Sequence, residues 1–315
     1  MVGSVSAIGF ELGAVVVSRT PSRLRYGAAR LFGDIAFATG GATRRQALQN
    51  YAGIAHRPES DPEVRRIARE SMVGYAKLLA DFVTLPRIRP EQIDAMVDWA
   101  GFENIEKALA QGKGAIVVTP HFGNWDIAAA AAVRKGLRLT VVTEHFGGPE
   151  LDRRVVESRE RLGMKVVPLS VSAGKAVLTA LRHGEVVALV CDLPPEEGRT
   201  VSVRVCGQQA IVPAGPAVLA LRTGAPVVPI MCRRLADNRY RIEVQAPLEV
   251  VASDDGDADV AHVAQAIMDR FEPELKATPE QWYLFSPMWD RAGGPPDADG
   301  RALPSGHVGS GVAAR

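Results

Sequence analysis

The chain has little of several features that would indicate particular classes of protein. Its 315 residues include only three cysteines, Cys191, Cys206 and Cys232, each within an apolar segment, and no Cys-x-x-Cys pair. An odd number of cysteines in such segments favours reduced, buried thiols over a disulfide framework. A cysteine nucleophile is therefore not favoured.

Charge of one sign and long apolar runs are also scarce. Lys and Arg number 37 against 36 Asp and Glu, a net charge of +1, which argues against nucleic acid as the main partner. Glu11 and neighbouring Gly and Ser residues interrupt the best apolar stretch before it reaches the roughly 18 residues of a membrane span. The N-terminus has neither a basic opening nor an A-x-A pattern, so we expect no secretory signal and a cytoplasmic location.

Sequence motifs for nucleotides, serine hydrolases and metals are missing too. Ser172-Ala-Gly-Lys175 lacks the first glycine of a Walker loop, and neither a dinucleotide-binding glycine motif after a strand nor a Gly-x-Ser-x-Gly elbow is present. His121, His145 and His183 are separated by spacings unlike those of metal sites. We therefore expect no metal and no resident cofactor.

What is present is an ordered succession of helices and strands. Residues 1–100 are predicted to be helical, 101–290 to form an α/β core and 291–315 to be a disordered Gly/Pro/Ala-rich tail. The core alternates strands and helices, which predicts a mostly parallel sheet flanked by helices, with ligands near the carboxyl ends of the strands. The Asp98-Trp-Ala-Gly101 segment is interpreted as a break. Predicted helices are 23–37, 44–54, 61–85, 102–111, 124–135, 150–162, 173–183, 214–223 and 260–275; predicted strands are 114–119, 138–143, 165–169, 186–191, 226–232 and 240–251.

Arginines dominate the charge of the N-terminal region. Up to residue 58, only Glu11 and Asp34 oppose them, and apolar residues interleave with them. This pattern is typical of amphipathic helices on an anionic membrane surface, and equally of a solvated helical face packed on the domain. The arginines are Arg19, Arg23, Arg25, Arg30, Arg44, Arg45 and Arg57.

The most informative segment runs from Gly114 to Asp126, with the sequence GAIVVTPHFGNWD. A short apolar strand ends at Pro120, His121 follows in a turn, and a helix starts near Asn124 with Gly123 or Asn124 as its N-cap. The turn allows Asp126 to reach one nitrogen of His121, which would leave the other nitrogen free to accept a proton. A structural histidine followed by a capping aspartate explains the same spacing.

The His121-x-x-x-x-Asp126 block resembles the HxxxxD block of the glycerolipid and lysophospholipid acyltransferase superfamily. With GKGAIVVTPH before it and NWD at its end, it is closest to the branch of lipid A late acyltransferases and phosphatidylinositol mannoside acyltransferases. A second block, from Gly207 through the Pro-Ala-Gly-Pro helix to the Thr-Gly-Ala-Pro-Val-Val-Pro strand, resembles the same branch, as does a segment around Trp282. The resemblance covers about residues 20 to 290.

The resemblance implies a metal-free acyl transfer without an acyl-enzyme. His121 would deprotonate an acceptor hydroxyl, Asp126 would orient its imidazole, and the hydroxyl would attack an acyl thioester, either acyl-CoA or acyl carrier protein. The family often has an acid facing the histidine at the strand end where Asp192 lies. The mannoside-acylating branch is expected to have Glu there, and a loop-starting aspartate is an equal alternative.

Further residues are predicted to bind substrate. The resemblance implies a phosphate-binding arginine at Arg159, and guanidinium geometry suits a phosphate. Arg199 is a candidate for an anionic headgroup or donor phosphate, with a solvated loop as the alternative. Glu144 follows a strand at the same edge, and Asn124 belongs to the histidine block.

The sequence therefore predicts an O-acyltransferase, peripheral on the cytoplasmic face of the membrane, with a membrane glycolipid as acceptor and an apolar groove for the acyl chain. A phosphatidylinositol mannoside and a lipid A precursor are the two acceptors that the resemblance implies. A catalytically silent, membrane-associated lipid-binding protein is the alternative of another class.

Overall fold

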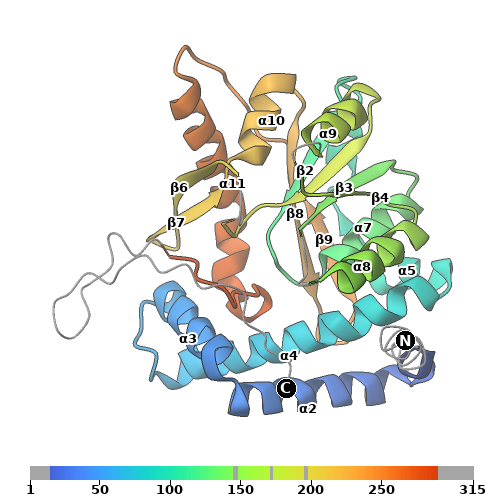
Figure 1. Ribbon diagram of the computed structural model, residues 1–315, viewed down its shortest axis with the longest axis vertical. Helices are drawn as coiled ribbons and strands as arrows, with labels where there is room; N and C mark the ends of the chain where they lie inside the picture. Colours follow the sequence, from blue (N-terminus) through green and yellow to red (C-terminus); the bar gives the residue numbers. More distant parts are fainter. Residues whose placement is uncertain (1–14, 145–147, 171–172, 195–197, 290–315) are drawn as a thin grey trace.

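The computed structural model describes residues 15–144, 148–170, 173–194 and 198–289, and places a helical layer beneath an α/β core (Figure 1). The layer consists of α2 (Ser22–Thr39), α3 (Gly41–Ala55) and α4 (Pro62–Thr84). α4 is the most amphipathic of these in pattern, and it buries Val64, Ile67 and Ala68 on its inner face. The predicted helices 23–37, 44–54 and 61–85 are confirmed to within a few residues.

Seven strands of the described residues form the main sheet, in the order β1-β9-β8-β2-β5-β3-β4. All neighbouring pairs are parallel except β8 and β9, so the predicted mostly parallel sheet is confirmed. In that order the strands are Val97–Ala100, Tyr240–Val244, Val227–Arg234, Ala115–Thr119, Val186–Val190, Leu139–Thr143 and Lys165–Pro168.

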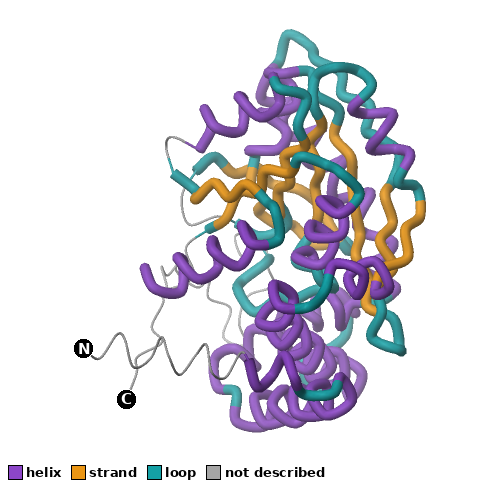
Figure 2. Tube along the Cα trace, turned by 90° about the vertical axis from the view of Figure 1, so that its right-hand side faces the viewer, coloured by secondary structure: helices purple, strands orange, loops and turns teal. Residues whose placement is uncertain are grey.

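Helices cover both faces of this sheet, as the tube view shows (Figure 2). Side chains on β2 alternate between two apolar clusters: Ile116 and Val118 face one, Ala115 and Val117 the other. The first cluster includes α9 (Ala173–Arg182), α10 (Gly215–Thr223), α11 (Gly256–Ala277) and the helical layer; the second includes α5 (Pro90–Met96), α6 (Glu103–Leu109) and α7 (Trp125–Arg134). A strand buried on both faces reads as a continuous apolar run, which is why β2 was predictable.

Four features of the fold differ from the sequence prediction. α5 was not among the predicted helices, because its seven residues bury only Ile93. The segment interpreted as a break contains β1, because a four-residue edge strand with only one buried side chain has too little apolar pattern to be recognised. A hairpin of β6 (Thr200–Val205) and β7 (Gln208–Pro213) was not predicted. The last predicted strand ends at Val244, since Pro247 follows and Leu248 makes only an isolated bridge with Val227.

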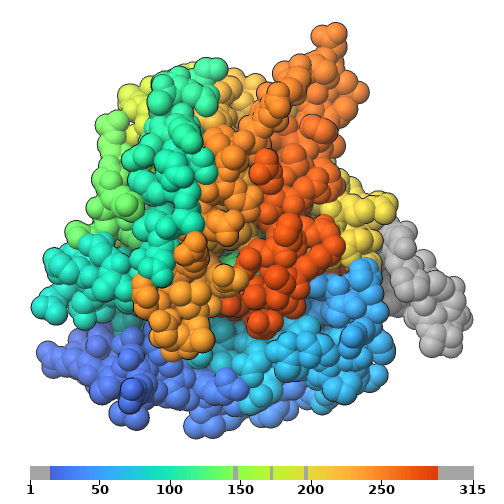
Figure 3. Space-filling view, turned by 180° about the vertical axis from the view of Figure 1, so that it is seen from behind, coloured from blue at the N-terminus to red at the C-terminus, as the bar shows by residue number. Residues whose placement is uncertain are grey.

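Seen from behind, the N-terminal helices form the lower side of the molecule, beneath the strands and the C-terminal helix (Figure 3). None of the helices in the described part of the chain is long and apolar enough to cross a bilayer. The predicted tail, 291–315, lies outside the described residues.

Candidate active site

The turn between β2 and α7 holds His121 at the carboxyl edge of the sheet. Gly123 has a φ of 61°, and a Cβ at this position would lie 1.7 Å from the backbone oxygen of Cys232. Its N–H donates to the carbonyl of Gln281 at 2.9 Å. Only glycine fits such a close backbone approach, so Gly123 fixes the path by which the chain carries His121 into the site.

Asn124 is the N-cap of α7, one of the two residues predicted for that role. Its Oδ1 accepts the N–H of Ile127 at 3.0 Å, and its Nδ2 donates to the Tyr240 hydroxyl at 3.0 Å. The side chain is 1% exposed. Asn124 was predicted to bind substrate, but the structure directs both of its polar atoms towards the protein.

Asp192, two residues after the end of β5, is the carboxylate that contacts His121. Its Oδ1 lies 2.7 Å from Nδ1 of the imidazole, and its Oδ2 accepts the backbone N–H of His121 at 3.0 Å. β2 and β5 are adjacent and parallel, so their carboxyl ends bring the two residues together. With the Nδ1 proton held by Asp192, the other ring nitrogen, Nε2, is the one available as a base.

Trp282 also binds Asp192, a contact that the sequence patterns did not predict. Its indole N–H donates to Oδ2 of Asp192 at 2.6 Å, and its backbone oxygen accepts the hydroxyl of Tyr51. The next residue, Tyr283, donates its backbone N–H to the carbonyl of His121 at 2.9 Å. The family resemblance around Trp282 indicated that this segment matters, but Trp282 lies 90 residues from Asp192 in the sequence, so the contact could not be predicted from spacing.

The protonation of the pair follows from these contacts. Burial favours the neutral form of His121, but the charge and hydrogen bond of Asp192, with a contribution from Glu144, outweigh it and raise the pKa of His121. Burial raises the pKa of Asp192. The charge of His121 and the hydrogen bonds from His121 and Trp282 lower it by more, so the net shift is downward. Asp192 is fully buried, while the side chain of His121 is 30% exposed and can meet a substrate.

Asp126 was predicted to orient His121, and the structure corrects this. The carboxylate of Asp126 instead binds Arg159, with Oδ1 2.7 Å from Nε and Oδ2 3.3 Å from Nη2. Arg159 also donates to the hydroxyl of Thr143 at 2.8 Å. The first turn of α7 points Asp126 towards α8 (Pro149–Arg161), away from the imidazole, which spacing along one chain segment could not reveal.

The same ion pair bears on the phosphate-binding role predicted for Arg159. Its side chain is 9% exposed and that of Asp126 is 6% exposed, so the two charges are balanced inside the protein. The pair joins α7 to α8 beneath the turn that carries His121. Its geometry supports a positioning role for both residues.

Of the other residues predicted to bind substrate, Glu144 lies near His121 and Arg199 lies elsewhere. Glu144 follows β3 at the site edge, and its charge acts on His121. Arg199 precedes β6 and pairs with Asp257 at the start of α11, with Nη2 2.6 Å from Oδ1, so the structure places it with the hairpin. His145 lies outside the described residues.

Aromatic side chains form one wall of the site. The Trp125 ring meets the His121 ring edge-on at 5.2 Å, and Tyr283 lies 6.3 Å from Trp125. Tyr75 of α4 contacts both Tyr283 and Phe285. Aromatic rings therefore flank the imidazole on the side of Trp125.

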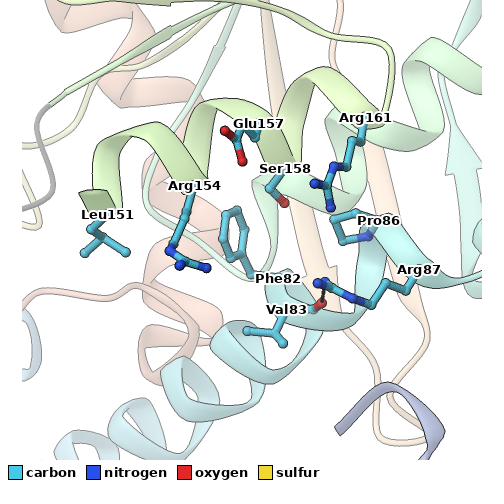
Figure 4. A pocket seen from close by; sticks show the side chains of 9 residues that line it. All are labelled: Phe82, Val83, Pro86, Arg87, Leu151, Arg154, Glu157, Ser158 and Arg161. Atoms are coloured by element: carbon cyan, nitrogen blue, oxygen red, sulfur yellow. Dashed lines mark hydrogen bonds between the residues drawn. The ribbon is translucent and has the colours of Figure 1, made fainter. Parts of the chain in front are cut away.

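A separate pocket lies where α4 and the following turn meet α8 (Figure 4). Its volume is about 40 Å³, enough for a few water molecules but not for a fatty chain. Phe82, Val83 and Pro86 point into it from one side, and Leu151, Arg154 and Ser158 from the other. None of the residues around His121 lines it, so this pocket is not the acyl groove.

A mostly parallel α/β sheet that presents a buried carboxylate and a partly exposed histidine at its carboxyl edge is an arrangement typical of α/β enzymes, which bind their ligands at that edge. Comparison with known proteins gives the family. The model for bacterial lipid A biosynthesis acyltransferases matches residues 8–291. The chain belongs to this family and is an acyltransferase, as the two sequence blocks predicted.

Individual relatives fall into two groups. A phosphatidylinositol mannoside acyltransferase of Mycolicibacterium smegmatis is 28% identical over 291 residues, covering 91% of this chain and 92% of its own length. One of Mycobacterium tuberculosis is 30% identical over 251 residues, covering 78% and 76%. The lipid A biosynthesis myristoyltransferase of Escherichia coli is 27% identical over 147 residues, covering 47% and 45%.

Proposed function

We propose that this protein transfers a fatty acyl chain from an acyl thioester to a hydroxyl of a membrane glycolipid, with His121 as general base and Asp192 as its partner. The observation that carries the proposal is the 2.7 Å contact between Nδ1 of His121 and Asp192. It fixes the tautomer with Nε2 unprotonated, and among the described residues no side chain is hydrogen-bonded to Nε2. An imidazole held this way is suited to accept a proton from an alcohol.

The reaction then needs no acyl-enzyme and no metal. Nε2 of His121 takes the hydroxyl proton while the oxygen attacks the thioester carbonyl. The oxyanion that forms can be stabilised by the N–H groups of Trp125 and Asp126, which lie in the first turn of α7 where a helix leaves its amides without an i−4 acceptor. Collapse expels the thiolate, which takes the proton from the imidazolium, and the products are an ester and a free thiol.

Asp192 supports this cycle electrostatically. The imidazolium that forms after proton transfer lies against a buried carboxylate whose pKa is lowered by the charge of His121 and by hydrogen bonds from His121 and Trp282. Charge compensation in a buried site strengthens the base. The aspartate that the HxxxxD block supplies, Asp126, acts through Arg159 to set the position of α7.

A phosphatidylinositol mannoside is the preferred acceptor. The mannoside-acylating relatives match 91% and 78% of the chain, whereas the lipid A relative of E. coli matches 47%. Both kinds of acceptor are membrane glycolipids, which supports a location on the membrane face where an acyl-CoA or acyl carrier protein is available. A lipid A precursor is the alternative acceptor.

The test measures thiol release from palmitoyl-CoA and from palmitoyl acyl carrier protein, with and without mixed membrane glycolipids in detergent. We expect acceptor-dependent release by the wild type and at least about a thousandfold less by His121→Ala. His183→Ala is the matched control, since His183 lies at the end of α9 and should retain full activity. The labelled product identifies the acceptor lipid.

Two outcomes would contradict the proposal. Unchanged turnover in a folded His121→Ala variant would refute the base mechanism. Lipid binding without thiol release from either donor would instead favour a catalytically silent lipid-binding protein.

A further inference from the structure

The helix α2 has one face packed on α4 and the opposite face exposed. Tyr26, Ala29 and Gly33 are the buried residues of α2. A Cβ at Gly33 would lie 2.6 Å from the Cα of Val73, so the two helices approach as closely as glycine allows. Figures 1 and 3 show α2 at the outer margin of the molecule, with α4 between it and the sheet.

The exposed face of α2 is apolar. Leu24, Leu31 and Ile35 are 66%, 62% and 52% exposed, and Phe32 beside them is 63% exposed. At about 100° per residue, Leu24, Leu31 and Ile35 fall within a narrow arc opposite the buried face. Of the nine large apolar side chains that the described residues expose, five lie between Val16 and Ile35. This concentration far exceeds the single, scattered apolar residues normal on a protein surface.

Small residues complete the strip, and cations border it. Gly27, Ala28 and Ala38 lie beside the three exposed aliphatic residues, within about 60° of Leu24 around the helix. Arg23 and Arg30 lie along one margin and Arg25 along the other, by the same helical geometry. Arg30 pairs with Glu70 of α4 at 2.8 Å, and Arg25 lies over the Tyr26 ring. Arg23 and Arg25 are therefore the margin cations that no carboxylate neutralises among the ion pairs of the described residues. The single acid of α2, Asp34, is bound to Arg69 of α4 at 2.8 Å.

We infer that this face of α2, defined by Leu24, Leu31, Phe32 and Ile35, inserts into the headgroup region of an anionic lipid bilayer. A helix with an apolar face and basic margins lies in the plane of the interface, with its side chains among the acyl chains and its arginines at the anionic phosphates. This inference rests on the proposed acyl transfer to a membrane glycolipid and names the surface by which the protein would contact the membrane. Its test does not depend on turnover.

Charge decides between a bilayer and a second copy of the chain as the occupant. Two α2 helices packed face to face would bring Arg23 and Arg25 of both copies together, and like charges across an interface oppose association. A bilayer with anionic headgroups supplies the opposite charge along both margins. The strip is also one helix wide, which suits shallow insertion.

Vesicle co-sedimentation tests the surface. Phosphatidylcholine vesicles with about 30% phosphatidylglycerol are compared with pure phosphatidylcholine, using the full-length protein. We expect the wild type to bind the anionic vesicles, and the triple variant Leu24→Ser, Leu31→Ser, Ile35→Ser to partition roughly a hundredfold less. The matched control, Leu169→Ser with Val251→Ser, changes exposed apolar residues elsewhere and should bind within about twofold of wild type.

A second variant removes any dependence on the folding of the triple mutant. Leu31→Trp keeps the face apolar, and its fluorescence should shift to the blue and be quenched by brominated acyl chains when anionic vesicles are added. Val251→Trp, exposed on a loop, should show neither change. Absence of a shift at position 31 while the protein sediments with vesicles would overturn the assignment.

The remaining outcomes separate the alternatives. If the triple variant binds vesicles as well as the wild type does, α2 is not the membrane-contacting surface. If the wild type is a dimer and the triple variant a monomer with unchanged vesicle binding, the exposed face of α2 contacts a second copy of the chain instead. Turnover on detergent-dispersed acceptor distinguishes this inference from the proposed function. Lost vesicle binding with full micellar turnover supports both, whereas vesicle binding without turnover refutes the reaction alone.

Discussion

Asp192 binds both the ring and the backbone of His121, so a single carboxylate sets the tautomer and the position of the proposed base. Asp192→Asn preserves the shape and removes the charge. We expect kcat/KM to fall by about 10²–10⁴, because the imidazolium loses its counter-charge and the amide can select the wrong tautomer. Steady-state kinetics with both thioester donors measure the loss.

The pH profile tests the same residue independently. His121 acts as a base only when neutral, so activity rises with pH through the pKa of His121. Asp192 raises that pKa, and Asp192→Asn should therefore move the acidic limb of kcat/KM to lower pH while the maximum falls. Asp192→Glu retains the charge and is the matched control. An acidic limb that stays in place in the Asn variant would argue against the pairing.

Gly123 provides a prediction about the turn that delivers His121. Gly123→Ala must hold a φ of 61° and place a methyl group against the Cys232 carbonyl, so we expect a loss of at least about 2 kcal/mol of unfolding free energy and nearly all activity. Gly27→Ala, in α2 with nothing within 4 Å of the added Cβ, should gain about 0.5–1 kcal/mol. Urea unfolding measures both; equal effects would contradict this account.

Sequence patterns predicted which residues belong to this site better than they predicted which of these residues contact one another. His121 and the strand-turn-helix around it were predictable because a buried strand, Pro120 and a capping residue are all local signals. The carboxylate that holds His121 comes from another strand, and its second donor, Trp282, lies 90 residues further on. Contacts between parallel strand ends depend on strand order, which spacing along the chain does not specify.

At the scale of elements, most helices and strands of the α/β core were predicted because each had the length and period of its class. The missed elements, α5, β1 and the β6–β7 hairpin, are short or half-exposed, and their stability comes from tertiary contacts. The helical layer was predicted as separate helices, but the way α2 and α4 join the core could not be read from periodicity alone.

A buried polar cluster makes that junction. Asp81 of α4 accepts hydrogen bonds from Tyr26 of α2 at 2.7 Å and from Tyr240 of β9, and it pairs with Arg234 of β8 at 2.6 Å. Tyr240 in turn binds Asn124 at the N-terminus of α7. α2 and the turn that carries His121 are therefore connected through one carboxylate.

Asp81→Ala should destabilise the protein by about 3–5 kcal/mol, because Arg234, whose side chain is 7% exposed, would keep an unpaired charge. Chemical unfolding measures the change. Asp94→Ala removes a carboxylate from an exposed pair with Arg134 and should have little effect. A small loss in both variants would show that the cluster does not hold the layer to the core.

At the scale of the whole molecule, the sheet divides the core into two apolar clusters that share every central strand. One cluster extends through α3 and α4 into the helical layer, and the other lies under α5, α6 and α7. Since the same strands line both, loss of one cluster removes one wall of the other. We therefore expect the helical layer and the α/β core to unfold as one cooperative unit.

The three cysteines can report on this cooperativity because they sample both clusters. Cys191 and Cys206 belong to the cluster shared with the helical layer, and Cys232 belongs to the other. All three are free and buried. Burial raises the pKa of Cys206 to about 11 and that of Cys232 to about 12, and that of Cys191 well above its usual value. None should react with a thiol reagent at pH 8 in the native state.

The cysteines are labelled with a thiol reagent at increasing urea concentrations, and mass spectrometry of each cysteine peptide measures the extent of labelling. The urea midpoint for each cysteine reports the free energy of the unfolding that exposes it. Equal midpoints at all three positions are expected, because a single transition exposes both clusters. A lower midpoint for Cys191 and Cys206 than for Cys232 would show that the helical layer detaches first. In that case the Asp81 cluster would be a hinge between two folding units, and Asp81→Ala should lower the midpoints of Cys191 and Cys206 alone.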